Sequence, residues 1–251
     1  MRVFVVPKKV WMAALSLCAV LAVTAAAAGC LIAARSNRLL PIYSVEDAKK
    51  RIAITFDAAW TADEVDELVE VLKKYDAKVT VFAVGDWVKR YPDAVKKLSD
   101  AGHELANHSD AHKHLDSMSK DEFCADVKAC NKRIEEITGR QVTLYRGPYG
   151  EYNNMAVAAI AEMGMYYLQW DCDSLDWKPN YTVDMVVEAA LKNVRSGSIM
   201  LLHIGAEPMI KALPIILERL KSEGYEFVTA GELIYKENYE IDHTGRQKSN
   251  L

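Results

Sequence analysis

The sequence predicts an α/β fold: a distorted seven-stranded (β/α) barrel behind an apolar N-terminal segment. Three observations support it. Short β-branched runs alternate with amphipathic helical runs from residue 51 to residue 235. The connections are short, as in parallel sheets with helices outside. Polar residues follow several predicted strands, and (β/α) barrels carry their chemistry at the carboxyl ends of strands. A doubly wound open sheet is the alternative, but it gathers groups from fewer strands at one rim.

The N-terminal segment from Val10 to Ala34 is almost continuously apolar and is long enough to cross a hydrocarbon layer of about 30 Å. We favour an uncleaved membrane anchor. A cleaved secretory signal and a lipoprotein signal ending at Cys30 are the alternatives. All three place the following domain outside the cytoplasm. The expected division is an anchor or signal at 1–38, a linker at 39–50, a barrel domain at 51–235 and a polar, frayed tail at 236–251.

The strands are predicted from short runs rich in β-branched and apolar residues: 51–56, 78–84, 104–106, 142–145, 166–170, 198–202 and 226–228. Between them, apolar residues at helical spacing predict helices from Thr61, at 93–101, from Ser119, at 155–163, 183–194, 210–222 and 230–235. Two helices begin with capping-box patterns, Thr61-x-x-Glu64 and Ser119-x-x-Glu122. Gly139 follows the second of these helices as an expected C-terminal cap.

Bulk composition narrows the classes of partner. The 251 residues fit one mid-sized domain plus an extension, and the net charge is -4. Nucleic-acid binding would call for a basic face, which this composition does not favour. We expect a monomer that meets a membrane through its N-terminal segment.

Four of the six histidines crowd into residues 103–114. His108 and His112 are four residues apart and can reach one metal ion if the turn between them is helix-like. Ser109 and Asp110 lie between them as candidate supporting partners. A histidine-rich polar surface loop is the plainer interpretation, and the pair alone does not decide between the two.

Candidate catalytic groups lie at the ends of other strands. Asp57 can take a proton from water if a neighbouring guanidinium keeps it ionised, although it could instead stabilise a helix N-terminus. The turn Arg146-Gly-Pro148-Tyr149-Gly could aim the Tyr149 N–H at a developing oxyanion, or be an ordinary tight turn. His203 ends an apolar strand and would often be a core histidine there.

An acidic stretch offers His203 a partner. A carboxylate bonded to an imidazole fixes its tautomer and raises its pKa, which suits a general acid. Asp176 is the candidate, and Trp177 follows it directly. A solvated acidic loop with Trp177 packed on the barrel is the alternative.

Taken in order, these pieces resemble the polysaccharide deacetylase family, which shares the NodB homology domain and is also described as carbohydrate esterase family 4-like. The likeness covers residues 51–235. Its five motifs are Thr55-Phe56-Asp57, His108-Ser109-x-x-His112, Arg146-Gly147-Pro148-Tyr149-Gly150, Asp173-x-x-Asp176-Trp177 and Leu201-x-His203.

The resemblance implies a barrel enzyme that removes acetyl groups from N-acetylated glycan of the cell wall, with a divalent metal, often zinc. It implies these roles: His108 and His112 as metal ligands, Asp57 as base held by Arg146, the Tyr149 N–H as oxyanion donor, and His203 as acid oriented by Asp176. Trp60, Pro148, Tyr149 and Trp177 would contact the substrate.

One position departs from the family pattern. The aspartate that normally follows the base and ligates the metal is Ala58 here, which weakens the expected metal site. The form Thr-Phe-Asp-x-x-Trp, ending at Trp60, is most similar to the sporulation-associated PdaB-type branch. The loss of the ligand leaves a second hypothesis, a non-catalytic protein that binds wall glycan.

Overall fold

The computed structural model describes residues 24, 38–47 and 49–250. The predicted anchor, Val10 to Ala34, therefore lies outside the described residues apart from Thr24. Among the residues that are described, no helix is long and apolar enough to cross a membrane. Leu40–Leu251 is one compact unit.

The unit is built on a curled parallel sheet with strand order β6-β5-β4-β3-β2-β8-β7, and β9 pairs separately with β2. The strands are β2 (Arg51–Ala58), β3 (Thr80–Ala83), β4 (Glu104–Asn107), β5 (Leu144–Tyr145), β6 (Tyr166–Tyr167), β7 (Cys172–Asp173), β8 (Ile199–Ile204) and β9 (Glu226–Phe227). The seven strands of the ordered path form an open half-barrel rather than a closed one. The predicted α/β barrel class is confirmed in this coarser form.

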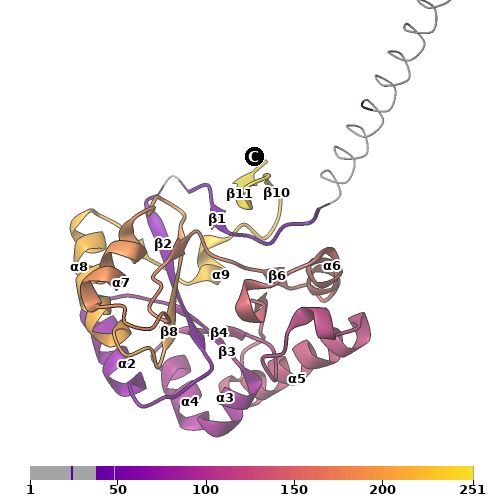
Figure 1. The fold of residues 1–251 in the computed structure, drawn as a ribbon, viewed down its shortest axis with the longest axis horizontal. Helices are drawn as coiled ribbons and strands as arrows, with labels where there is room; N and C mark the ends of the chain where they lie inside the picture. The colour runs from indigo at the N-terminus through magenta and orange to yellow at the C-terminus, as the bar shows by residue number, and fades with distance from the viewer. Residues whose placement is uncertain (1–23, 25–37, 48, 251) are drawn as a thin grey trace, which may run out of the picture. The chain divides into compact units, whose positions relative to one another are not determined.

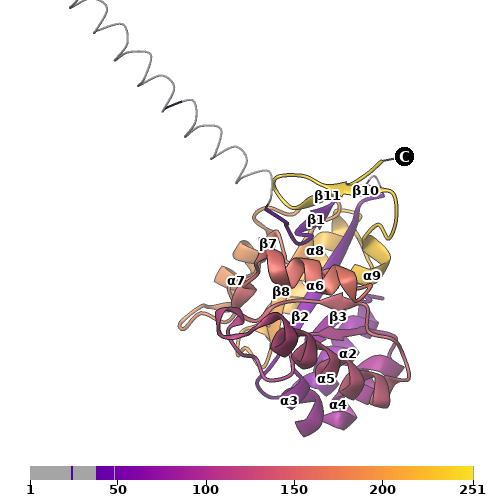
Figure 2. The same ribbon diagram turned by 90° about the vertical axis from the view of Figure 1, so that its right-hand side faces the viewer.

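Helices cover the outside of the curled sheet (Figures 1 and 2). They are α2 (Val65–Lys74), α3 (Gly85–Arg90), α4 (Pro92–Asp100), α5 (Lys120–Thr138), α6 (Asn154–Glu162), α7 (Val183–Leu191) and α8 (Met209–Ser222). The short helix α9 (Ala230–Leu233) instead packs its buried Ala230 and Leu233 in one cluster with Ala53 and Phe82 of the sheet. Short 3-10 turns occur at Leu115–Ser117 and Pro148–Gly150. The structure adds α3 and β7 to the elements predicted from the sequence, and β6 is shorter than predicted.

Strand β2 shows how the sheet aims its side chains. Ile54 and Phe56 pack into the apolar cluster that the helices share, whereas Ala53 belongs to a second cluster inside the curl of the sheet. Side chains alternate along a strand, so Asp57 has the inward parity of Ala53. Ala58 belongs to the outer cluster and is fully buried there.

Two predictions about helix starts have different outcomes. The Ser119–Glu122 capping box is confirmed, and Gly139 ends α5 in the left-handed conformation. The capping box from Thr61 is wrong, because Glu64 itself is the N-cap of α2 and no side-chain cap bond forms. The Glu64 carboxylate instead accepts a hydrogen bond from the distant Gly205 N–H.

The prediction of a frayed tail is also wrong. Strands β10 (Tyr239–Ile241) and β11 (Arg246–Ser249) form a three-stranded sheet with β1 (Ser44–Val45), which lies in the predicted linker. Figure 1 shows the three strands side by side. The buried Gln247 side chain bonds both the N–H and the carbonyl of Tyr235, which fixes the tail to the end of the barrel unit.

Candidate active site

The carboxyl ends of the strands bring most predicted site residues to one cavity of about 630 Å³. Asp57 on β2 is the register partner of His203 on β8, which places the two groups side by side. The predicted site residues that line the cavity are Asp57, Trp60, His108, His112, Tyr149, Trp177 and His203. Arg146 and Asp176 are buried and bond directly to two of these lining residues. Pro148 is buried in its turn and is not among the lining residues.

Asp57 is a buried carboxylate with one oxygen fixed. Arg146 is fully buried, and its Nη1 donates to Oδ1 of Asp57 at 2.8 Å. The guanidinium also lies 4.1 Å from the centre of the Phe82 ring and donates to the carbonyl of Gln169. Burial alone would raise the pKa of Asp57, but the neighbouring His108 and the charge of Arg146 outweigh it and hold that pKa below its usual value. Asp57 is therefore set to remain ionised.

His108 has a defined tautomer because of its partners. Its Nδ1 lies 2.9 Å from the carbonyl oxygen of Arg146, which can only accept, so Nδ1 carries the proton. Burial lowers the pKa of His108, which keeps the ring neutral. Its Nε2 therefore carries a lone pair and no proton, and the Nε2 atom lies 3.4 Å from Oδ2 of Asp57.

His112 reaches the same place by a route other than the predicted helical turn. Ser109 and His112 both adopt positive φ, 70° and 52°, so the segment is an irregular loop. The Ser109 hydroxyl accepts the N–H of His112, and the rings of His108 and His112 have centroids 5.0 Å apart. Asp110 is turned to an ion pair with Arg133 at 2.7 Å and is not available to the histidines.

The donor atoms present fit a divalent metal only in part. Burial, with the neighbouring His108, lowers the pKa of His112 to about 4, so both imidazoles are neutral and able to ligate. Ala58 contributes no donor. In the described part of the chain no group of three His, Cys, Asp or Glu side chains is arranged to hold a metal. Catalytic zinc usually has three protein ligands, so the pair of imidazoles is one ligand short.

His203 is held on two sides. Its Nδ1 lies 2.8 Å from Oδ1 of Asp176, and its backbone N–H donates to Oδ2 of the same carboxylate. The Trp60 ring stacks on the imidazole with a centroid separation of 5.5 Å and an interplanar angle of 19°. Burial opposes the charged form, but the hydrogen bond and charge of Asp176 outweigh it and raise the pKa of His203. The ring is thus suited to donate a proton from Nε2.

Aromatic side chains form the rim. Tyr149 has φ 59° and is 58% exposed, and its ring stacks on His114 at 4.1 Å and meets His112 edge-on. Glu151 bonds Nδ1 of His114 at 2.7 Å and accepts the N–H of Leu115, which fixes this side of the rim.

The structure adds lining residues to which the sequence analysis gave no role, although Asp173 stands in the fourth motif of the resemblance. Asp86 and Arg90 come from α3, and Trp170 and Asp173 are joined by an indole hydrogen bond of 3.2 Å. Helix α3 has only six residues, and β7 only two, so neither gave a periodic signal. The position of Asp86 and Arg90 at the cavity therefore depends on tertiary packing.

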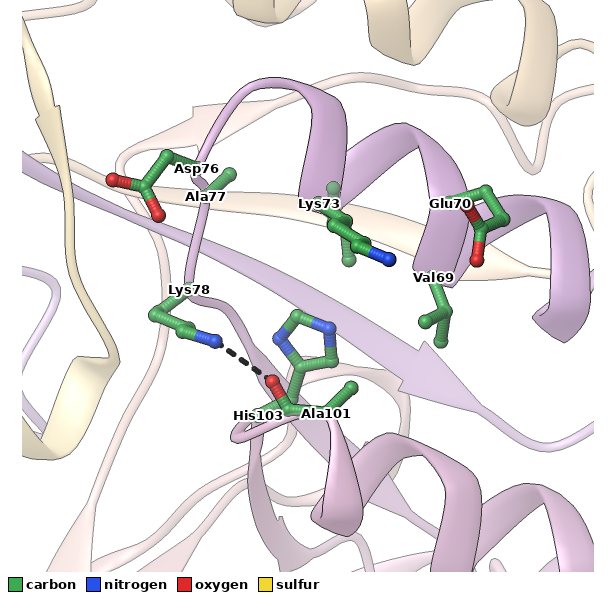
Figure 3. A pocket seen from close by; sticks show the side chains of 9 residues that line it. Val69, Glu70, Lys73, Asp76, Ala77, Lys78, Ala101 and His103 are labelled. Carbon is green, nitrogen blue, oxygen red and sulfur yellow. Dashed lines mark hydrogen bonds between the residues drawn. The ribbon is translucent and has the colours of Figure 1, made fainter.

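His103 belongs to a different region from the other clustered histidines. It lines a second cavity, of about 400 Å³, at the amino ends of β3 and β4 (Figure 3). Lys78 there donates to the carbonyl of Ala101 at 2.7 Å, and burial lowers the pKa of His103 to about 4. This cavity lacks the carboxylate–guanidinium and carboxylate–imidazole pairs of the first. The chemistry therefore concentrates at the carboxyl ends of the strands.

Comparisons with known proteins identify the family to which this chain is similar. The family model described as Polysaccharide deacetylase matches residues 44–168. A peptidoglycan-N-acetylglucosamine deacetylase of Bacillus cereus is 33% identical over 197 residues, which are 76% of this chain and 92% of that protein. The peptidoglycan-N-acetylglucosamine deacetylase PgdA of Listeria monocytogenes is also 33% identical, over 76% of this chain but only 40% of its own length.

A solved structure adds a caution about activity. BA3943 of Bacillus anthracis, described as a CE4 family pseudoenzyme, superimposes with a TM-score of 0.74 at 30% identity, over 78% of this chain and 69% of that one. A mutant of BA3943 is described as having restored enzymatic activity. Proteins described as active and as inactive therefore share this fold. Whether a chain with this fold is an enzyme depends on the side chains in its cavity.

Proposed function

Since this chain belongs to the polysaccharide deacetylase family, we propose that it is an extracytoplasmic de-N-acetylase that hydrolyses the acetamide of N-acetylated cell-wall glycan. One observation carries the proposal. Asp57, with a lowered pKa, and His203, with a raised pKa, are register partners in one cavity. A pair of groups whose environments move their pKa values apart is suited to serve as base and acid.

The proposed reaction begins at Asp57. Arg146 occupies Oδ1, so Oδ2 is the oxygen that can take a proton from a water molecule. That water attacks the acetamide carbon, and the Tyr149 N–H at its turn is the proposed donor to the oxyanion. His203 then gives its Nε2 proton to the sugar nitrogen, the C–N bond breaks, and acetate and the free amine leave.

His108 and His112 are the residues that would hold a divalent cation in this proposal, with zinc the expected ion. Such a cation, when bound, would act as a Lewis acid on the acetamide oxygen. Trp60, Tyr149 and Trp177 are exposed aromatic side chains at the cavity, which suits contact with sugar rings. Pro148 would support them only through the turn it stiffens.

The location and branch of the family are part of the same proposal. The apolar run from Val10 to Ala34 favours membrane anchoring with the domain outside the cytoplasm, where wall glycan lies. The Thr55-Phe56-Asp57-x-x-Trp60 form favours the sporulation-associated PdaB-type branch. The protein is proposed to act as a monomer.

A second candidate function is glycan binding without turnover. Ala58 and the similarity to a protein described as a pseudoenzyme favour it. Two features oppose glycan binding without turnover. Arg146 and Asp57 form a buried ion pair, and His203 makes two hydrogen bonds to Asp176. A buried ion pair is costly to keep, and a binding groove alone does not require one.

Acetate release separates the two functions. Purified full-length protein would be given N-acetylated chitooligosaccharides and wall glycan, with chelator or with added Zn²⁺ or Co²⁺. The variants are Asp57→Asn and His203→Ala, and Met185→Ala, on the exposed face of α7, is the matched control. We expect release by the wild type and control and none by the two site variants.

The contrary result is equally clear. If wild type and both variants release equally little acetate under every metal condition, yet bind glycan equally well, the protein is a binding module. Circular dichroism of each variant would confirm that the fold is intact before the comparison is made.

A further inference from the structure

The strand end that carries His203 is tied to a distant acid. Gly205 follows two residues after His203, and its N–H donates to Oε1 of Glu64 at 2.5 Å. Glu64 starts helix α2, where the sequence pattern predicts that it should cap its own helix. The structure directs its carboxylate across to the turn between β8 and α8 instead.

This turn packs tightly against the loop that carries Trp60. Gly205 has φ 93°, and a Cβ added there would lie 2.9 Å from Cγ2 of Thr61 and 3.3 Å from Cβ of Trp60. The Trp60 loop and the Gly205 turn are thus in contact at backbone level. Because the Trp60 ring stacks on His203, the position of this loop decides how the imidazole is covered.

Glu64 is also electrostatically close to the partner of His203. Burial raises the pKa of Glu64, and the negative charge of Asp176 raises it further. The hydrogen bond from the Gly205 N–H lowers it by a smaller amount than burial raises it. Asp176 and Glu64 therefore bond the two ends of the short segment from His203 to Gly205, and the Trp60 ring stacks on the His203 imidazole. Both oxygens of Asp176 bond His203, and the Glu64 carboxylate bonds the turn that follows it.

We propose that Glu64 is a positioning residue for His203: its carboxylate holds the Gly205 turn, which keeps the imidazole between Asp176 and the Trp60 ring. The proposal rests on the proposed role of His203 as general acid. It explains why a carboxylate placed to cap α2 leaves that helix uncapped. It also assigns Trp60 a second task, since one face of its indole covers His203 while the residue remains 47% exposed.

The test uses the full-length protein with three variants. Glu64→Ala removes the acceptor, Glu64→Gln keeps an acceptor oxygen without the charge, and Asp63→Ala changes the exposed neighbouring acid as a matched control. The first readout is the His203 pKa by NMR of the imidazole, assigned with a His203→Gln sample. The second is kcat against pH on an N-acetylated chitooligosaccharide.

We expect Glu64→Ala to lower kcat roughly tenfold, because small misplacement of a catalytic group is costly. The His203 pKa should fall toward its ordinary value as the Asp176 contact loosens, and the alkaline limb of the rate profile should move to lower pH. Glu64→Gln should restore both properties to within about twofold of wild type. Asp63→Ala should change neither.

An unchanged His203 pKa in Glu64→Ala would overturn the proposal whatever the activity, and so would a Gln variant as damaged as the Ala variant. Should Glu64→Ala fail to fold, Glu64→Asp replaces it, since it keeps the charge but shortens the reach. Glu64→Asp must then lower the pKa of His203, as predicted for Glu64→Ala. Absence of acetate release by the wild type would refute the proposed function alone, because the NMR readout needs no turnover.

Discussion

Nε2 of His108 lies 3.4 Å from Oδ2 of Asp57, and both atoms are acceptors. The proton of His108 is on Nδ1, which donates it in a hydrogen bond to the Arg146 carbonyl, so the imidazole supplies no donor between the two lone pairs. Two facing acceptors are stabilised by a cation between or beside them. This relationship, and not the sequence motif alone, makes the histidine pair a candidate metal site.

Restoring a third ligand should strengthen metal binding. We expect Ala58→Asp to bind Zn²⁺ more tightly than wild type by about tenfold, equivalent to about 1.4 kcal/mol. Ala58 is fully buried in the outer apolar cluster, so the new carboxylate should lower thermal stability without metal, and it should recover that stability with metal by turning toward the histidines. Calorimetric titration and thermal melts with and without Zn²⁺ measure both effects.

The control for that gain is a second change in the same background. Adding His112→Ala to Ala58→Asp should remove the extra affinity, because the site would again be one ligand short of three. Equal Zn²⁺ affinity in wild type and Ala58→Asp would show that this description of an incomplete site is wrong.

Arg146 should matter for stability as well as for activity. It is fully buried, and its removal would leave the Asp57 carboxylate buried without its partner. We expect Arg146→Ala to lower the free energy of unfolding by about 3–5 kcal/mol, measured by urea denaturation. Arg140→Ala, at an exposed position, should change it by no more than about 0.5 kcal/mol. Equal losses for the two arginines would contradict the ion pair.

The pH dependence follows from the raised pKa of His203. A proton donor with a raised pKa stays charged above the ordinary histidine range, so activity should fall only as pH rises through that higher value. Asp176→Asn removes the charge that raises it, and the alkaline limb should move to lower pH. Rates of acetate release between pH 5 and 10 would locate the alkaline limb; an unmoved alkaline limb would exclude His203 as the acid.

The same linkage predicts stability. A raised folded pKa contributes stability that is fully present below the unfolded value near 6.5 and is lost as pH rises through the folded value. The difference in unfolding free energy between wild type and Asp176→Asn should therefore shrink from pH 6 to pH 9. A difference that grows with pH would contradict the sign of the shift.

The sequence predicts the strand ends better than it predicts their surroundings. Asp57, His108 and His203 end strands with strong apolar runs, and parallel pairing puts such ends at one edge. Strand β7 and helix α3 are too short to show a hydrophobic period. Strand β7 forms because it pairs with β8, and helix α3 forms where it packs against the neighbouring helices. Asp86 and Arg90 of α3 could therefore not be found from local pattern, and Asp173 of β7 is named only through the fourth motif of the resemblance.

Glu64 and the tail show the same limit in another form. The capping pattern at Thr61 predicts a local hydrogen bond for the Glu64 carboxylate. The carboxylate instead accepts the backbone N–H of Gly205, 141 residues away. The polar tail has no apolar run, yet β11 pairs with β1 through backbone groups that composition does not reveal. Both outcomes depend on contacts between distant residues, which no single window of sequence contains.

Trp177 should act on substrate binding and not on the chemical step. It lines the cavity and is 47% exposed, whereas the side chains that bond Asp57 and His203 are Arg146 and Asp176. Trp177→Ala should therefore raise KM for an N-acetylated oligosaccharide roughly tenfold with kcat little changed, the pattern expected when binding is lost equally from ground and transition states. Met185→Ala, an exposed apolar change on α7, should leave both constants alone. A fall in kcat without a rise in KM would instead place Trp177 among the groups that act on the transition state.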